Sequence, residues 1–194
     1  MNKLIITSMV MILTGCVTTQ SSQSGGSELN KGSHEAKLAP ERVYFSGMSN
    51  ELATDALLVS LLNKNYMAKK IAPNSVGVQL GNHQFVLQPS LNPNGIDRIL
   101  ASRYYSVHPK LQGSQDLIAV LGSLNDKLNF AKFTLRDDGK VIQVQGAATF
   151  VDTLELEELR RFLIWTDDAL DSVGQALPAS AAEFIKPLPV MPIF

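Results

Sequence analysis

The stretch KFTLRDDGKVIQV, residues Lys132 to Val144, decides the fold because it predicts a β-hairpin whose register can be checked. A two-residue loop at Asp138-Gly139, a common hairpin turn, fixes which residues pair across the strands. The pairs are Leu135 with Ile142, Phe133 with Val144, Lys132 with Gln145, and Thr134 with Gln143. The first two pairs are apolar and the other two are polar, so one face of the hairpin suits a core. A shift of one residue would mix the two kinds of side chain.

A second hairpin comes earlier in the chain and passes the same test. Its two-residue loop is Gly81-Asn82, and its pairs are Leu80 with His83, Gln79 with Gln84, Val78 with Phe85, and Val76 with Leu87. Apolar side chains again gather on one face, and the two glutamines lie on the other. The segment ILASRYYSV, Ile99 to Val107, predicts a third strand because it is rich in residues that favour strands.

Three segments carry apolar residues at helical spacing. The first runs from Asn50 to Asn63 and carries Leu52, Ala56, Val59 and Leu62 at helical spacing, with Leu58 and Leu61 beside them. The second runs from Ser114, a suitable N-cap, to Leu128, with a stripe at Leu117, Leu121, Leu124 and Leu128. The third follows a box-like start at Asp152 and Glu155 and ends before Pro178. Its stripe is Leu156, Leu159, Leu163, Leu170, Val173 and Leu177, interrupted by Thr166.

The order of these elements is helix, three antiparallel strands, helix, two-stranded hairpin and long C-terminal helix. It predicts an α+β domain, because the strands come as hairpins without the strand–helix–strand pattern of a parallel sheet. We expect this domain to span residues 40–177.

Two runs in the second half of this domain resemble the YbjN-like domain: Leu124 to Phe150 (LNDKLNFAKFTLRDDGKVIQVQGAATF) and Leu154 to Val173 (LELEELRRFLIWTDDALDSV). The shared features are a helix ending in Leu-Asn-x-x-Leu-Asn-Phe, a strand Ala-Lys-Phe-x-Leu, an Asp-Asp-Gly turn and a closing helix of acidic and apolar residues. The resemblance implies a fold like that of the class I type III secretion chaperones. It also implies a small binding or regulatory module without established chemistry.

Secretion chaperones with this fold hold extended partner chains on their sheet and helix surfaces, frequently as dimers. The resemblance therefore implies a protein partner and allows a homodimer. A shared fold does not by itself transfer this task to the chain.

The N-terminus has the layout of a secretory signal peptide over residues 1–15. Lys3 supplies a positive charge, Leu4 to Leu13 is a short apolar run, and Thr14-Gly15 gives small residues before Cys16. A membrane-spanning helix needs roughly 20 apolar residues, so this run is too short to remain as one. One alternative is an ordinary cleaved signal followed by an accidental cysteine.

Leu13-Thr14-Gly15-Cys16 resembles the lipobox of bacterial lipoproteins, and Cys16 is the single cysteine of the chain. The resemblance implies diacylglycerol on the Cys16 sulfur, cleavage before Cys16 and acylation of the new amino end. Because Val17 rather than aspartate follows, it also implies the outer membrane, with the domain facing the periplasm. Residues 16–39 are rich in Ser, Thr, Gln and Gly, so we expect a lipidated flexible tether.

The composition excludes some partners. Lys and Arg number 17 against 18 Asp and Glu, and 45% of the residues are hydrophobic. A near-neutral chain of this kind lacks the basic face of a nucleic-acid binder, so we expect no nucleic-acid partner.

No motif for catalysis, cofactor binding or metal binding stands out. His34, His83 and His108 are far apart and show no metal-ligand spacing. The acidic group Glu155, Glu157 and Glu158 is followed at helical spacing by Arg160 and Arg161, which favours a solvated helix face. We therefore expect no enzyme, no cofactor and no metal.

A candidate partner surface lies on the predicted third strand. Arg98, Arg103, Tyr104 and Tyr105 bring cationic and aromatic groups together there, and adjacent residues of a strand point to opposite faces. At least one tyrosine would then lie on an open face, and the alternative is a pair of partly buried tyrosines.

Residues 178–194 form a Pro-rich apolar tail that ends in FIKPLPVMPIF, Phe184 to Phe194. The three prolines of this final run favour an extended segment over a helix. We expect the tail to cover part of the sheet or a helix groove, and to be able to yield that groove to a partner.

These observations favour a lipid-anchored periplasmic module that binds protein chains in a chaperone-like or regulatory role. One alternative is an envelope enzyme or small-ligand binder with an unrecognised site. Another is a structural accessory subunit of an envelope complex.

Overall fold

The computed structural model describes residues 41–81, 83–176 and 181–191, and it confirms the α+β class. The predicted signal peptide, the tether and Cys16 lie outside the described residues. The helices are α1 (Asn50–Asn63), α2 (Gln115–Lys127), α3 (Leu156–Ala176) and α4 (Ala181–Phe184). The strands are β1 (Arg42–Tyr44), β2 (Ala68–Ala72), β3 (Ser75–Leu80), β4 (His83–Ser90), β5 (Asp97–Val107), β6 (Lys132–Arg136), β7 (Val141–Phe150), β8 (Thr153–Glu155) and β9 (Ile185–Pro187).

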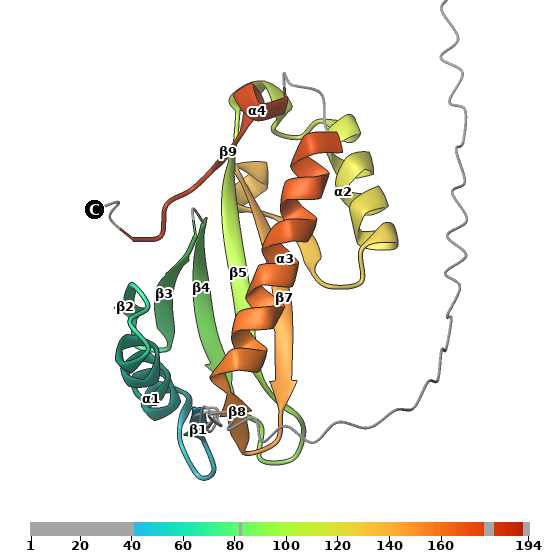
Figure 1. Ribbon diagram of the computed structural model, residues 1–194. Helices are drawn as coiled ribbons and strands as arrows, with labels where there is room; N and C mark the ends of the chain where they lie inside the picture. Colours follow the sequence, from blue (N-terminus) through green and yellow to red (C-terminus); the bar gives the residue numbers. More distant parts are fainter. Residues whose placement is uncertain (1–40, 82, 177–180, 192–194) are drawn as a thin grey trace, which may run out of the picture. The chain divides into compact units, whose positions relative to one another are not determined.

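Most strands belong to one antiparallel sheet in the order β2-β3-β4-β5-β7-β6, with β9 paired to β5. The short strands β1 and β8 form a separate antiparallel pair. Figure 1 shows β5 and β7 side by side at the centre of the sheet, although β6 and α2 lie between them in sequence. The strands β1, β2, β8 and β9 were not predicted.

Both predicted hairpin registers are confirmed. The β3–β4 pairs run from Val76 with Leu87 to Leu80 with His83, and the β6–β7 pairs include Phe133 with Val144 and Leu135 with Ile142. The second turn is wider than expected, because the strands end at Arg136 and Val141 and a short 3-10 turn occupies the loop. Asp137, Asp138 and Gly139 all have positive φ in this loop, which aspartate and glycine tolerate better than most residues.

The helix α1 has the predicted limits but buries few of the residues whose spacing predicted it. Ser49 caps it, with its Oγ accepting a hydrogen bond from Leu52 N at 3.2 Å. Its buried residues are Ala53, Thr54, Leu57 and Leu61, whereas Leu52, Val59 and Leu62 are exposed. Of the apolar residues whose spacing predicted this helix, only Leu61 is buried, and Ala56 and Leu58 are half-buried. Apolar side chains lie all around this helix, so spacing alone does not select the face that packs.

The helices α2 and α3 bury most of the predicted leucines, namely Leu117, Leu121, Leu156, Leu159, Leu163 and Leu170. Leu124 and Leu128 are half-buried, and the predicted Leu177 lies outside the described residues. Ser114 Oγ accepts a hydrogen bond from Leu117 N, which confirms the expected cap of α2. In α3 the polar Thr166 is only 3% exposed, and its Oγ1 donates to the Phe162 carbonyl at 2.8 Å. The predicted start of α3 at Asp152 is wrong. Residues Thr153–Glu155 form β8 and pair with β1, so the helix begins later, at Leu156.

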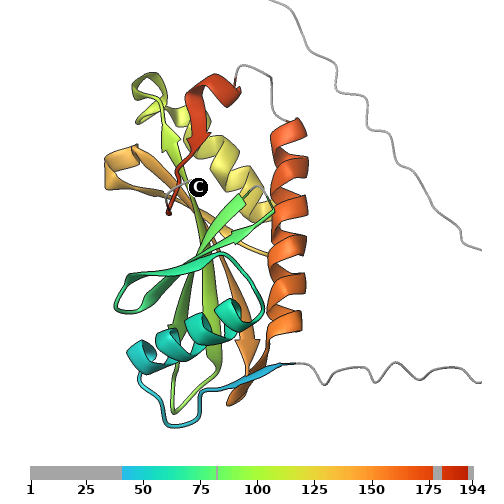
Figure 2. The same cartoon turned by 60° about the vertical axis from the view of Figure 1, so that its left-hand side comes forward.

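All three long helices pack on the same face of the sheet. One buried cluster joins α1 and the first half of α3 to Val76, Phe85 and Ile99. A second cluster joins α2 and Leu170 of α3 to Phe133 and Val144. Figures 1 and 2 show α3 running along the sheet, with α1 near one end of α3 and α2 beside the other.

The opposite face, reached by alternate residues such as Gln84, Ser102 and Gln143, carries none of the described helices. We call it the open face. No helix in the described ranges is both long and apolar enough to cross a membrane.

Candidate functional site

The strand β5 carries all four residues of the predicted partner surface, but it does not expose them together. Arg103 and Tyr105 point to the face covered by the helices, and Arg98 and Tyr104 point to the open face. Arg103 is only 6% exposed, so its assignment to an exposed surface is corrected here. Both tyrosines are half-buried, as the alternative interpretation expected. Arg98 is exposed, and its Nε lies 3.5 Å from Ser90 Oγ.

Arg103 is the centre of a partly buried charged cluster between the sheet and α3. Its Nη1 lies 2.6 Å from Asp167 Oδ1. The other oxygen of Asp167 accepts a hydrogen bond from His83 Nδ1 at 2.7 Å, and His83 Nε2 lies 3.8 Å from Asp171. The guanidinium also stacks over the ring of Phe85 at 5.5 Å. The cluster thereby links the first residue of β4, His83, to α3.

The environment of Tyr105 follows from this cluster. Burial is the largest cause that raises the pKa of Tyr105 above its usual value, and the negative charges of Asp167 and Asp171 act in the same direction. The nearby positive charge of Arg103 opposes them in part. The raised pKa extends to higher pH the range over which the Tyr105 phenol is neutral.

The side chains of His83, Asp167 and Asp171 bring possible metal-ligand atoms within 4.8 Å of one another. Sequence spacing missed this group because its members come from a turn and from a helix far along the chain. Arg103 already neutralises Asp167, and His83 is engaged with the same carboxylate. The cluster is thus an internally paired ion network, and we assign no metal to it.

The predicted pairing of acidic and basic residues is confirmed for Glu157, whereas Glu155 lies in β8 and pairs with Arg42 at 2.8 Å. Glu157 accepts hydrogen bonds from Arg160 at 2.7 Å and from Arg161 at 3.2 Å. The hydrogen bond from Arg160 is the largest cause that lowers the pKa of Glu157 to about 2. These ion pairs lie on a solvated helix face and form no cleft.

The open face is polar and largely satisfied by its own side chains. Gln143 Nε2 donates to Ser102 Oγ at 3.2 Å, and Gln145 Nε2 donates to the same oxygen at 3.0 Å. Arg136 Nε donates to Gln143 Oε1 at 2.8 Å. Every buried side-chain nitrogen or oxygen in the described ranges has a partner. Ser102 and Gln143 are themselves buried, so these polar groups bond to one another on this face rather than to solvent.

The apolar tail crosses from the edge of β5 onto this open face. Its strand β9 pairs Val107 with Ile185 and Tyr105 with Pro187. The chain then continues to Met191, which is only 7% exposed and lies against β3 at Gly77. Figures 1 and 2 show this red segment descending along the sheet from α4. The tail therefore packs on its own domain.

Two residues of the hairpin hold the end of the tail. Gln84 Oε1 accepts hydrogen bonds from the main-chain N–H groups of Val190 at 2.8 Å and Met191 at 2.9 Å. Gly77 has no side chain, and a Cβ there would lie 2.6 Å from Met191 Cγ. We call these two residues with the β5 edge at Tyr104–Val107 the tail groove. A small cavity of about 200 Å³ opens beneath it, lined by His83, Arg103, Leu188 and others.

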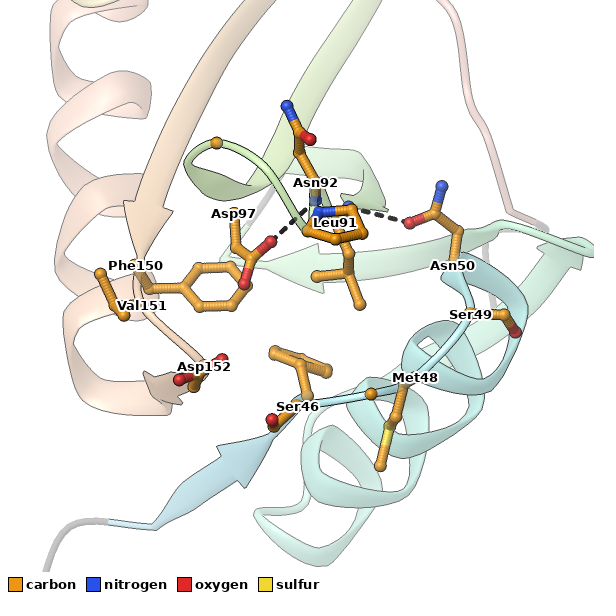
Figure 3. Close-up of a pocket in the computed structure, with 14 residues that line it drawn as sticks. Ser46, Met48, Ser49, Asn50, Leu91, Asn92, Asp97, Phe150, Val151 and Asp152 are labelled. Atoms are coloured by element: carbon orange, nitrogen blue, oxygen red, sulfur yellow. Dashed lines mark hydrogen bonds between the residues drawn. The ribbon is translucent and has the colours of Figure 1, made fainter.

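A larger cavity of about 580 Å³ lies at the other end of the sheet (Figure 3). The segment that enters α1, the β4–β5 connection and the end of β7 form its walls. Phe150 and Leu91 give it an apolar floor, and Asn50 Oδ1 fixes the wall by accepting from Leu91 N at 2.9 Å. In Figure 3 the side chains of Asp97 and Asp152 lie on the side of the cavity nearest Phe150.

The charge of this large cavity is negative. Its lining includes the carboxylates of Asp97 and Asp152 and no Lys, Arg or His. Neither carboxylate takes part in an ion pair within the part of the chain that the structure describes. Asp97 Oδ1 accepts one hydrogen bond, from Asn92 N at 2.9 Å. The cavity therefore suits a positively charged group on an apolar stem.

No protein-family model matches the chain, and no curated protein matches it. Its structure is similar to the crystal structure of YbjN from E. coli, described as "a putative transcription regulator". The two chains share 20% identity at a TM-score of 0.48, and the similarity covers 70% of this chain and 95% of that one. This likeness concerns the fold alone, and no function of YbjN is transferred to this chain.

Proposed function

We propose that the chain is a lipoprotein whose domain binds extended segments of a partner protein and has no catalytic role. The signal peptide at residues 1–15 is removed, Cys16 carries the lipid, and residues 16–39 tether the domain to the outer membrane on its periplasmic side. The proposed location rests on the arrangement of Lys3, the apolar run and the lipobox-like residues that end in Cys16.

The observation that carries the binding role is the pairing of β9 with the edge of β5. An unpaired strand edge offers a row of main-chain donors and acceptors, and addition of an extended peptide is a common mode of recognition. Here the edge beyond β4 receives a three-residue strand from a Pro-rich segment at the far end of the chain. The surface thus has the chemistry to hold an extended chain.

Photo-crosslinking in the native membrane tests this role. A photoreactive side chain at Tyr104, within the tail groove, is expected to give one discrete protein adduct. The same group at Ile118, exposed on α2, is expected to give none. The Cys16→Ser variant, which removes the proposed lipid, should lose the adduct and the acyl mass on the mature chain. Equal adducts from both positions, or none from position 104, would contradict the proposal.

The large cavity favours a second candidate function, the binding of a small organic cation. Its two unpaired carboxylates and apolar floor match an ammonium group on a short alkyl chain, and its volume is in the range of small-molecule sites. A hydrogen bond to a charged group is worth about 1.5–3 kcal/mol, so each carboxylate is expected to contribute about tenfold or more to affinity.

Titration with n-pentylamine, followed by calorimetry or NMR, tests this second candidate. Asp97→Asn and Asp152→Asn are each expected to weaken binding about tenfold. Asp126→Asn, an exposed residue of α2, serves as the matched control and should leave binding unchanged. Pentanoate, with the opposite charge on a similar stem, should not bind. Equal affinity for the two probes would rule out the cation site.

A further inference from the structure

We propose that the tail groove selects an extended partner segment with the pattern of residues 185–191, and that this chain's own tail is an exchangeable occupant. The expected partner carries prolines at alternate positions and a long unbranched apolar residue two positions after the second proline. This inference rests on the proposed binding function and names the kind of chain that is bound.

Main-chain hydrogen bonds hold the tail at β5. The N–H of Leu188 donates to the Tyr104 carbonyl at 2.8 Å, and the N–H of His108 donates to the Phe184 carbonyl at 2.8 Å. Ser106 Oγ adds a bond to the Lys186 carbonyl at 3.2 Å. Because these contacts use the backbone of the tail, another extended segment can make them equally well.

The positions of the prolines fit this register. Along an antiparallel strand, alternate residues turn their N–H groups toward the neighbouring strand. The bond from Leu188 places the even-numbered tail residues in that position, so Pro187 and Pro189 fall where no ladder donor is needed. The missing N–H groups also leave the outer side of the tail without donors at these two residues, which discourages a further strand.

The end of the tail supplies the side-chain selectivity. Gln84 Oε1 binds two successive N–H groups, so a proline at either Val190 or Met191 would remove one of the bonds. Met191 fills the space left by Gly77, where any Cβ would overlap its Cγ and Sδ. A flexible unbranched side chain suits such an irregular space better than a β-branched one.

The same contacts indicate that the tail can be displaced. The strand β9 has three residues, and residues Lys186 to Pro189 are all exposed. Between the paired strand and the Met191 site, little apolar surface is therefore buried. Segments with few buried contacts open at low free-energy cost relative to the core.

A labelled peptide Ile-Lys-Pro-Leu-Pro-Val-Met, the sequence of residues 185–191, tests the proposal by fluorescence anisotropy with the full chain in detergent. The covalently attached tail competes at a high effective concentration, so wild-type protein should bind the peptide weakly. The variant Leu188→Ser/Met191→Ser, with its tail disarmed, is expected to bind at least about tenfold more tightly. Gly77→Val fills the space that Met191 occupies, so this variant should not bind the peptide tightly.

The control peptide Ile-Pro-Lys-Pro-Leu-Val-Met has the same composition but places its prolines at the ladder positions. Loss of two hydrogen bonds of about 1 kcal/mol each should weaken its binding by about tenfold or more. Adding Gln84→Ala to the disarmed variant should remove tight binding, whereas Gln88→Ala, on the same face of β4 and bonded to Ser75, should not. Circular dichroism melting of each variant checks that the domain is folded.

Equal binding of the two peptides, or no binding by the folded disarmed variant, would overturn the assignment of the groove. Crosslinking at position 104 decides the proposed function separately. Selective peptide binding without a crosslinked adduct in the membrane would support the proposed selectivity of the groove and contradict the proposed binding of a partner protein. A crosslinked adduct without selective peptide binding would support the partner protein and contradict the proposed selectivity of the groove.

Discussion

Replacing Asp167 by alanine is expected to lower the free energy of unfolding by about 3 kcal/mol, because removal of one partner of a buried ion pair leaves the other charge uncompensated. Asp167 bonds both Arg103 at 2.6 Å and His83 at 2.7 Å, and the Arg103 side chain is only 7% exposed. Urea denaturation at neutral pH measures the loss. The variant also releases the β3–β4 turn from α3, so protection of the turn against hydrogen exchange should fall.

The neighbouring residue provides the control for this experiment. Asp168 is exposed on the same turn of α3, so Asp168→Ala should change stability by no more than about 0.5 kcal/mol. The double variant Arg103→Met/Asp167→Leu removes both charges and should be far less destabilised than the sum of its single changes. If Asp167→Ala costs no more than Asp168→Ala, the cluster does not hold the turn.

Replacing Gly146 by alanine is expected to cost about 2 kcal/mol, because added atoms in a well-packed core force neighbouring groups to move. A Cβ at Gly146 would lie 2.8 Å from the Phe130 carbonyl oxygen and 2.8 Å from Phe162 Cζ of α3. The carbonyl belongs to the backbone and cannot rotate away. Thermal and urea unfolding measure the effect.

The same substitution at Gly174 should act in the opposite direction. Gly174 lies in α3, and an added Cβ there would have no atom within 4 Å apart from its chain neighbours and the nearby backbone of its own helix, so alanine should stabilise by roughly 0.5–1 kcal/mol through its helix propensity. Opposite signs for these two changes would show that space rather than backbone freedom decides the effect. Destabilisation by both would contradict the packing assigned to Gly146.

Local sequence patterns were sufficient for the elements that depend on their own neighbours. The hairpins around Gly81 and Asp138 follow from alternation and turn chemistry, and their registers hold residue by residue. The limits of α1 likewise follow from its Ser49 cap and its apolar content. In each case the interactions that define the element join residues close in sequence.

The errors concern interactions between distant segments. The strand β1 forms only because β8 lies beside it, and the pairing of Arg42 with Glu155 has no local signal. In α1 the apolar residues surround the helix, so only the sheet determines that Leu57 is buried and Leu52 is exposed. Short strands of this kind are invisible to periodicity.

The candidate site was predicted in part. The composition of the tail suggested that it covers the sheet, and Gly77 within a strand is the type of signal that marks a close approach. The role of Gln84 depends on the path of the tail and could not be read from the hairpin alone. Arg103 was selected for its charge, but its partner Asp167 lies on another element, so sequence could not show that the charge is buried and paired.

The strand β9 pairs with β5 but follows it by many residues in the sequence, so the two strands do not emerge at the same time. A chain that is exported through a membrane emerges from its N-terminal end, so at the proposed location β5 reaches the periplasm before residues 185–191. Until then the edge at Tyr104–Val107 has no covering strand, and a neighbouring molecule that arrives early meets no competitor. Under the proposed binding role, the order in which the segments emerge, and not affinity alone, would therefore influence which segment occupies that edge first.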